Sequence, residues 1–333
     1  MKKLLTSLTA LAMCIAGTAP AAAASADSPV YQDFTFIVGD DGNAAIMGYL
    51  GDSADITIPA MIENHTVTKI GNCAFEDNLT IKNVTLPDTI TEIQYKAFAD
   101  CRELKTINFP DSLKTIGEYA FTTCHSLESI DLNQVERIGR CSFQLCISLE
   151  EITVPGTIST IPDHAFHGCH SVKALTFEEG VTEICSTAVL NAFSLREITI
   201  ADSVTSIGEH AVGYTYYSPN FTRVDTVIYG SNGSAAEEYA KANGFTFLPT
   251  GVELGDLNAD LKVDATDAAL LLVAAAAKGA GNSSGLSAAQ EAAADTDGSG
   301  DYNAADATRI LQYAAYAGSG GTGSFKEYLS HLV

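Results

Sequence analysis

The stretch INFPDSLKTIGEYAFTTCHSLES, residues 107–129, decides the fold because close copies of it lie on both sides. The copy before it is VTLPDTITEIQYKAFADCRELKT (84–106), and the two after it are IDLNQVERIGRCSFQLCISLEE (130–151) and ITVPGTISTIPDHAFHGCHSVKA (152–174). Further copies begin at residues 175 and 198, so the period is 23 residues. A period of this length indicates a solenoid in which each copy forms one coil.

One apolar position recurs in every copy and predicts a continuous core. It is occupied by Phe75, Phe98, Phe121, Phe143, Phe166, Val189 and Val212. A single copy cannot bury its own Ile, Leu and Phe side chains, so neighbouring copies have to stack. Each copy is therefore expected to supply a short strand such as ITVP, a turn, and a compact segment that ends in AFxxC.

Cysteines occupy a second column of the repeats. Four of them follow the Phe of the AF or SF pair by three residues: Cys101, Cys124, Cys146 and Cys169. A buried free cysteine behaves as a small hydrophobe, so we expect these four in the core and not in disulfides. Cys73, Cys141 and Cys185 lie outside this column, and the sequence leaves open whether any of them form a disulfide.

The start of the chain predicts export. Lys2 and Lys3 precede the apolar run LLTSLTALAMCIAG and the small-residue stretch APAAAASA, which is typical of a secretory signal peptide over residues 1–26. The formal net charge of −23 argues against nucleic acid or an anionic membrane as partner, because both would repel the chain. We expect a secreted, extracellular protein without membrane insertion.

Two acidic stretches near the C-terminus match calcium loops. Calcium prefers oxygen ligands, which a twelve-residue loop supplies from positions 1, 3, 5, 7, 9 and 12, with a backbone carbonyl at position 7. In the first loop these positions are Asp256, Asn258, Asp260, Lys262, Asp264 and Asp267. In the second they are Asp295, Asp297, Ser299, Asp301, Asn303 and Asp306. An apolar helical stretch follows each loop, so the sequence predicts two bound Ca²⁺ ions.

The sharp turn at loop position 6 differs between the two loops. The second loop has the expected Gly300 there, whereas the first has Leu261. Leu disfavours positive φ, so the first site is expected to be distorted or weaker.

The repeats resemble the BspA-type leucine-rich repeat family, whose pattern is IGxxAFxxCxxLxxIxIP. The resemblance covers about residues 30–249 and includes GSNGSAAEEYAKANGFTFLPT, which resembles the usual C-terminal cap of that family. It implies a surface or secreted interaction scaffold without catalysis. About residues 255–320 closely resemble a type I dockerin. That resemblance implies a calcium-dependent fold that binds a cohesin module of a scaffoldin, as in the cellulosomes of anaerobic bacteria.

The dockerin resemblance also implies which residues contact the cohesin. In the family they are loop positions 10 and 11 and two positions on the following helix, here Ala265, Thr266, Leu272, Val273, Ala304, Ala305, Leu311 and Gln312. Many members carry Ser-Thr in the loop and a basic residue on the helix. This chain has neither, which implies an apolar contact and a different cohesin class. The likeness of the two halves is compatible with binding in either of two orientations, and helix packing alone would also explain it.

The predicted fold is a repeat solenoid of short parallel strands with turns and short helices, followed by a small all-α dockerin with two EF-hand-like loops. The expected layout is a signal peptide at 1–26, a capped solenoid at 27–249, a linker at 250–254, and the dockerin with its C-terminal extension at 255–333. We expect a non-catalytic cellulosome component that displays an interaction or adhesion domain. The alternatives are an unrecognised polysaccharide-degrading enzyme and a regulator of a neighbouring cellulosomal enzyme.

Two shorter stretches allow two interpretations each. Aromatic residues in YTYYSPNF (214–221) either form an exposed binding patch or cover the open end of the solenoid core. The cluster DHAFHGCH (163–170) either binds zinc or consists of variable outward positions beside a buried cysteine, and the repeat register favours the second interpretation.

Overall fold

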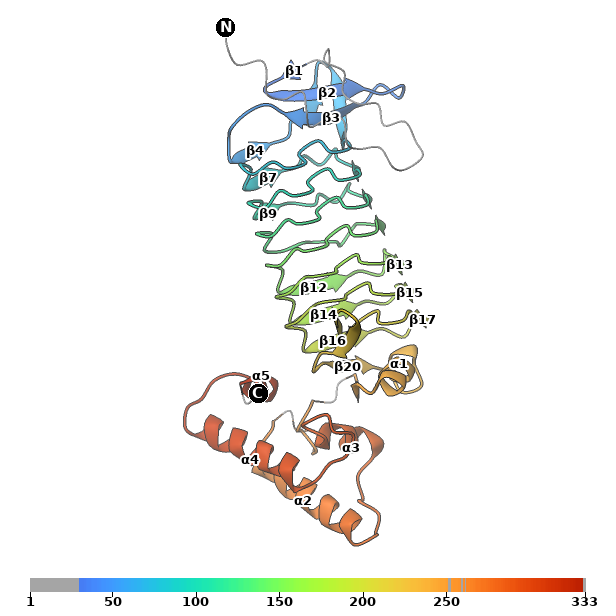
Figure 1. Ribbon diagram of the computed structural model, residues 1–333, viewed down its shortest axis with the longest axis vertical. Coiled ribbons are helices and arrows are strands. Elements are labelled where there is room, and N and C mark those ends of the chain that lie inside the picture. The colour runs from blue at the N-terminus through green and yellow to red at the C-terminus, as the bar shows by residue number, and fades with distance from the viewer. Residues whose placement is uncertain (1–29, 251–252, 259, 261, 332–333) are drawn as a thin grey trace.

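The computed structural model describes residues 30–250, 253–258, 260 and 262–331. It is an elongated stack of coils with antiparallel strands at its N-terminal end and a group of helices at the other end (Figure 1). This arrangement confirms the predicted fold class, a repeat solenoid followed by a small all-α domain. The predicted signal peptide lies outside the described residues.

Two columns of parallel strands run along the solenoid. One column consists of β4 (Asp55–Thr57), β7 (Asn83–Thr85), β9 (Thr106–Ile107), β12 (Glu151–Val154), β14 (Ala174–Phe177), β16 (Glu197–Ile200), β20 (Val227–Gly230) and β21 (Thr246–Pro249). The other consists of β6 (His65–Ile70), β8 (Glu92–Ile93), β10 (Thr115–Ile116), β11 (Arg137–Ile138), β13 (Thr160–Ile161), β15 (Glu183–Ile184) and β17 (Ser206–Ile207). Ile152 pairs with Leu175, and Leu175 pairs with Ile198, so the strand register reproduces the sequence period.

Additional elements cover the two ends of the stack. At the N-terminal end, β1 (Val30–Tyr31), β2 (Phe34–Val38) and β3 (Ala44–Tyr49) form an antiparallel sheet, and β5 (Met61–Ile62) pairs with β6. At the C-terminal end lie the hairpin β18 (Tyr214–Tyr217) and β19 (Asn220–Arg223) and the helix α1 (Ala235–Asn243). The helix begins at the N-cap Ser234 and ends at Gly244, which adopts φ 70°.

The stacked phenylalanines form the spine of the core. Rings from successive coils lie nearly parallel, with centroid distances of 4.9 Å from Phe75 to Phe98, 5.3 Å from Phe98 to Phe121, 5.4 Å from Phe121 to Phe143 and 5.6 Å from Phe143 to Phe166. All seven predicted anchor residues are buried. The period therefore identified the core positions correctly.

The cysteine column lies beside this spine and is also fully buried. Each thiol donates a weak hydrogen bond to the backbone carbonyl of the phenylalanine in the preceding coil. Cys101 donates to Phe75 at 3.0 Å, and Cys124 donates to Phe98 at 3.1 Å. The prediction that these four residues act as small core hydrophobes is confirmed. Within the described part of the chain, no disulfide joins any of the seven cysteines, and this includes the three outside the column.

The C-terminal domain is built from four helices: α2 (Ala265–Gly279), α3 (Ala288–Ala294), α4 (Ala304–Gly318) and α5 (Phe325–Ser330). The two long helices pack against each other through buried residues such as Leu271 and Ile310. Leu254, which falls in the predicted linker, is buried in the same core. Within the described part of the chain, every helix is too short or too polar to cross a membrane.

Candidate functional site

The first acidic loop is organised around its last carboxylate. Asp267 is fully buried, and its Oδ1 accepts hydrogen bonds from the backbone N–H groups of Leu257 at 2.8 Å and Asn258 at 3.1 Å. Its Oδ2 accepts the N–H of Asp264 at 2.9 Å, and Asp264 in turn caps α2. One side chain thus ties the start of the loop to the start of the helix, as in a capping box.

The second loop repeats this arrangement. The buried Asp306 accepts hydrogen bonds on Oδ1 from the N–H and the hydroxyl of Thr296, both at 2.9 Å. Its Oδ2 accepts the N–H of Asn303, the N-cap of α4, at 2.9 Å. The last carboxylate of each loop therefore joins the start of the loop to the N-cap of the following helix.

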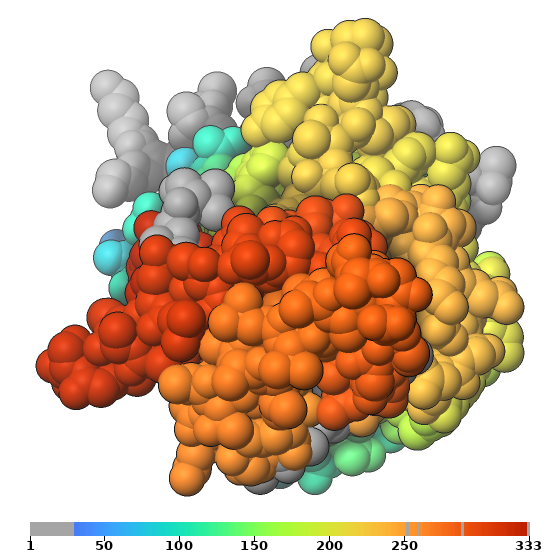
Figure 2. All heavy atoms as spheres, turned by 90° about the horizontal axis from the view of Figure 1, so that it is seen from below, coloured from blue at the N-terminus to red at the C-terminus, as the bar shows by residue number. Residues whose placement is uncertain are grey.

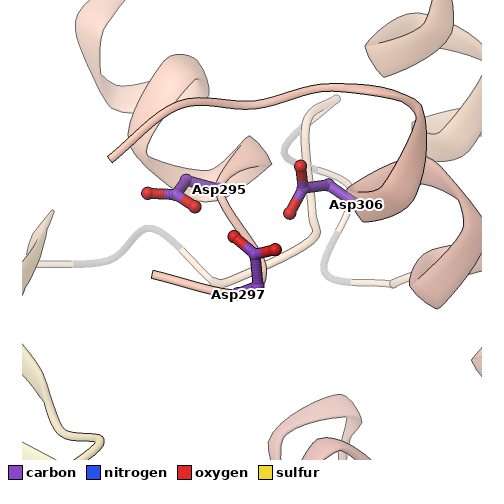
Figure 3. Close-up of side chains that lie close together, drawn as sticks. All are labelled: Asp295, Asp297 and Asp306. Carbon is purple, nitrogen blue, oxygen red and sulfur yellow. The ribbon is translucent and has the colours of Figure 1, made fainter. Parts of the chain in front are cut away.

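Three carboxylates converge in the second loop. Figure 3 shows Asp295, Asp297 and Asp306 facing one another, and one oxygen from each lies within 4.8 Å of the others. In the part of the chain that the structure describes, this is the one group of acidic, His or Cys side chains gathered closely enough for a metal ion. Such a set of hard oxygen donors fits calcium.

The pKa values of this group reflect partial burial and a nearby cation. Burial raises the pKa of Asp295 to about 6. Burial acts in the same direction on Asp297, but the Arg309 guanidinium and hydrogen bonds from Ser299 outweigh it and lower the pKa of Asp297 to about 2. Arg309 lies 2.8 Å from Asp297 and 3.5 Å from Asp306. Sequence reasoning missed Arg309, although its place one helical turn after Asp306 could have indicated it.

The other predicted ligands of the second loop lie around this cluster. Asp295 accepts the backbone N–H groups of Ser299 at 3.0 Å and Gly300 at 2.8 Å. Gly300 adopts φ +84°, which agrees with the turn expected at position 6. The exposed side chain of Asp301 pairs with Lys278. Because this ion pair uses the side chain, the backbone carbonyl of Asp301 stays the predicted calcium ligand at position 7.

In the first loop the acidic side chains turn onto the loop's own backbone. Asp256 and Asn258 both accept the N–H of Asp260, at 3.2 and 2.9 Å. Asp260 accepts the N–H of Lys262 at 3.0 Å. Among the described residues, these carboxylates do not gather as those of the second loop do. Leu261 lies outside the described residues, so its expected effect stays a prediction, as do all twelve calcium ligands.

The predicted partner-binding residues share one property, which is exposure. Every one of them is exposed: Ala265, Thr266, Leu272, Val273, Ala304, Ala305, Leu311 and Gln312. Val273 leaves 69% of its surface open, which is unusual for a branched apolar side chain. Figure 2, seen from below, shows α2 and α4 on the face turned away from the solenoid. The helices therefore present two apolar patches to solvent.

The structure separates the two interpretations of the aromatic insertion. Tyr214 is only 9% exposed and covers the core, where its ring meets Phe245. In contrast, Tyr217 is 65% exposed, and Tyr216 and Phe221 are exposed beside it. The hairpin forms the yellow lobe that projects from the solenoid in Figure 2. One ring thus acts as a cover, and the other three are available for contact.

The histidine cluster is held by amides. Gln144 lies 2.9 Å from Nδ1 of His167, and Asn191 lies 3.1 Å from Nε2. Burial, together with the smaller effect of the neighbouring His164 and His170, lowers the pKa of His167 to about 4. Both ring nitrogens are engaged within the repeat, which favours the structural interpretation over a zinc site.

Comparison with known proteins agrees with this architecture. The family described as BspA type leucine rich repeat region matches residues 54–168 and 136–226, about half of the chain, with six copies. The family described as dockerin type I domain matches residues 254–313. No curated protein sequence matches significantly.

Two solved structures are similar to the solenoid. A leucine-rich repeat protein from T. pallidum is 25% identical over 54% of this chain and 86% of that chain, with a TM-score of 0.50. A leucine-rich cell surface protein from Faecalibacterium prausnitzii is 23% identical over 68% of this chain and 73% of that chain, also with a TM-score of 0.50. Both resemblances predicted from the sequence are confirmed. The chain belongs to the BspA-type leucine-rich repeat family and carries a type I dockerin domain behind its repeats.

Proposed function

We propose that this chain is a secreted, non-catalytic component of a cellulosome. Its dockerin, with one Ca²⁺ ion in each loop, binds a cohesin module of a scaffoldin, and its solenoid serves as an interaction or adhesion domain. A dockerin implies a cohesin partner and calcium, and leucine-rich repeats imply protein interaction. Neither module is catalytic, and together they match most of the chain between residues 54 and 313.

The exposed apolar patches on α2 and α4 carry this proposal. Leu272 and Val273 on α2, and Leu311 on α4, lie in solvent although soluble domains normally bury such residues. Their positions are those that the dockerin resemblance assigns to cohesin recognition. An apolar cohesin surface would bury them and would explain why no basic residue stands there.

Calcium fits the second loop through its three converging carboxylates. Asp295, Asp297 and Asp306 would hold the ion together with Ser299, Asn303 and the carbonyl of Asp301. Calcium would neutralise their mutual repulsion and fix the loop against α4. In the first loop the same loop positions would hold a second ion.

The test is capture of the mature chain on a panel of immobilised cohesin modules, in calcium and in chelator. We expect retention by at least one cohesin in calcium only. Because the two patches are alike, Val273→Asp alone should weaken capture, and the double variant with Leu311→Asp should abolish it. Leu79→Asp is the matched control because Leu79 is a leucine on the solenoid whose exposure lies between those of Val273 and Leu311. Capture that is unchanged in the double variant, or equal in chelator, would contradict the proposal.

The solenoid's own contact surface is proposed to be the projecting hairpin. Tyr217 and Phe221 expose aromatic rings there, and tyrosine is favoured at protein interfaces. Proteins of the host secretome that the chain retains in chelator would be solenoid ligands. Tyr217→Ala is expected to release them, whereas Tyr95→Ala, on the body of the solenoid, should not.

A further inference from the structure

The dockerin packs directly against the solenoid and shares a hydrophobic core with the last solenoid strands. Leu248 on β21 is fully buried, and it belongs to the same cluster as Leu257 and Ala293 of the dockerin. Val227 and Tyr229 on β20 pack against this cluster. The last two solenoid strands are therefore part of the surface on which the dockerin folds.

A second contact is made by α5. Lys326 lies 2.8 Å from Glu197 on β16 and 4.2 Å from the centre of the Tyr229 ring, and only 17% of its side chain is exposed. Its neighbour Phe325 is buried in the dockerin core, where it contacts the start of the domain at Gly255. The helix therefore links the dockerin core to the solenoid through two adjacent residues.

The second calcium loop borders the solenoid directly at this junction, whereas the first loop contributes only its buried Leu257 to the shared core. The backbone of Gly298, at loop position 4, packs on Thr246 of β21, so that an added Cβ would be 3.2 Å from the Thr246 hydroxyl. Asp295 lines a cavity of about 60 Å³ together with Arg196 and Asp225 of the solenoid and with Lys326. None of the described residues between 256 and 267 lines this cavity or the larger cleft beside α5.

We propose that calcium binding at the second loop and the seating of the dockerin on the solenoid stabilise each other, while the first loop binds calcium independently. The inference rests on the calcium binding of the proposed function. Its physical basis is linkage, because any contact that favours the calcium-bound loop must be favoured by calcium to the same extent. The seated dockerin then presents its cohesin residues in one fixed direction, away from the repeats.

The test removes a solenoid contact and leaves the dockerin sequence untouched. Glu197→Gln in the full mature chain deletes the partner of Lys326 and changes no residue of either loop. Thr246→Trp crowds Gly298 from the solenoid side and serves as a second variant. Glu92→Gln is the matched control, since Glu92 on β8 also forms an ion pair with a lysine, Lys69 on β6 at 2.9 Å, but near the N-terminal end of the solenoid.

The readout is hydrogen exchange of loop peptides during a calcium titration, because it reports each loop separately. In Glu197→Gln, the calcium concentration that half-protects residues 293–306 is expected to rise about fivefold or more. Residues 253–267 should shift less than about twofold, and Glu92→Gln should match the wild type. In the wild type, calcium should also slow exchange in β20 and β21.

Three results would overturn the inference in distinguishable ways. If both loops shift together, the solenoid contact acts on the whole domain and not on the second loop. If neither loop shifts in either variant, the junction is not coupled to calcium. If calcium protects no loop in the wild type, the calcium proposal fails and this inference with it. Loss of cohesin capture alone would leave the coupling intact.

Discussion

Replacing Asp306 with Asn removes one charge and little volume, yet it should unfold the dockerin at a much lower temperature. The Asp306 carboxylate is fully buried and accepts three hydrogen bonds, two from Thr296 and one from Asn303. An Asn side chain has only one acceptor oxygen. Its NH₂ group must therefore face either the N–H of Thr296 or the N–H of Asn303. At least one buried donor is left without an acceptor, whichever way the amide is turned.

The size of the effect follows from these contacts. A hydrogen bond to a charged group contributes about 1.5–3 kcal/mol, and a buried unsatisfied donor costs a similar amount. The substitution also weakens the ion pair between Asp306 and Arg309. We therefore expect a loss of about 2–4 kcal/mol in the free energy of unfolding in saturating calcium. For a domain of this size, that corresponds to a fall of roughly 10–30 °C in Tm. Calcium affinity of the second loop should fall at least about a hundredfold.

The assay is thermal unfolding of the mature chain followed at 222 nm, where the helices of the dockerin dominate over the short strands of the solenoid. Asp301→Asn is the matched control because it makes the same chemical change in the same loop. The Asp301 side chain is exposed and pairs with Lys278 at the surface, where solvent screens the ion pair, so Asp301→Asn should leave Tm almost unchanged. Equal falls in Tm for the two variants would refute the reasoning.

Two further predictions concern the solenoid. Phe121→Ala should lower the free energy of unfolding by about 3–5 kcal/mol, because its buried ring stacks on Phe98 and Phe143. Chemical denaturation of the solenoid should then show two transitions in place of one. A single transition, destabilised by less than about 1 kcal/mol, would contradict this prediction. The pKa of His167 is lowered to about 4 from an ordinary 6.5. As pH falls, the unfolded chain therefore binds a proton at this residue before the folded chain does. The free energy of unfolding of the solenoid should drop between pH 6.5 and 4 by about 1–2 kcal/mol after allowance for solvent screening. His167→Gln should flatten this dependence, and an identical acid profile in the variant would disprove the assignment.

The repeated parts of the molecule were predictable residue by residue. The Phe121 and Cys124 columns follow from the period alone, because every coil offers its neighbour the same environment. The acidic loops were predictable for a related reason: a fixed ligand spacing is needed to surround one ion. The structure adds the buried, hydrogen-bonded state of Asp267 and Asp306, which spacing could not indicate.

The junction between the two domains was not predictable. Lys326 meets Glu197 across more than a hundred residues of sequence, and neither residue belongs to a repeated pattern that would relate them. Leu254 falls in a short stretch that reads as a linker, yet it is buried in the dockerin core. Such contacts depend on the shapes of the two folded domains. A single sequence contains no periodic pattern that predicts how those shapes fit together.

The geometry of this junction limits how the dockerin can work. The solenoid covers the dockerin on the side of α5 and the second loop, whereas Val273 and Leu311 remain exposed on α2 and α4. The proposed cohesin contact and the contact with the solenoid would therefore use different surfaces and need not compete. Calcium at the second loop would stabilise the contact between dockerin and solenoid without burying either apolar patch. The same ion that orders the docking helices would then also hold the repeats at a constant angle to the scaffold, which a flexible linker could not do.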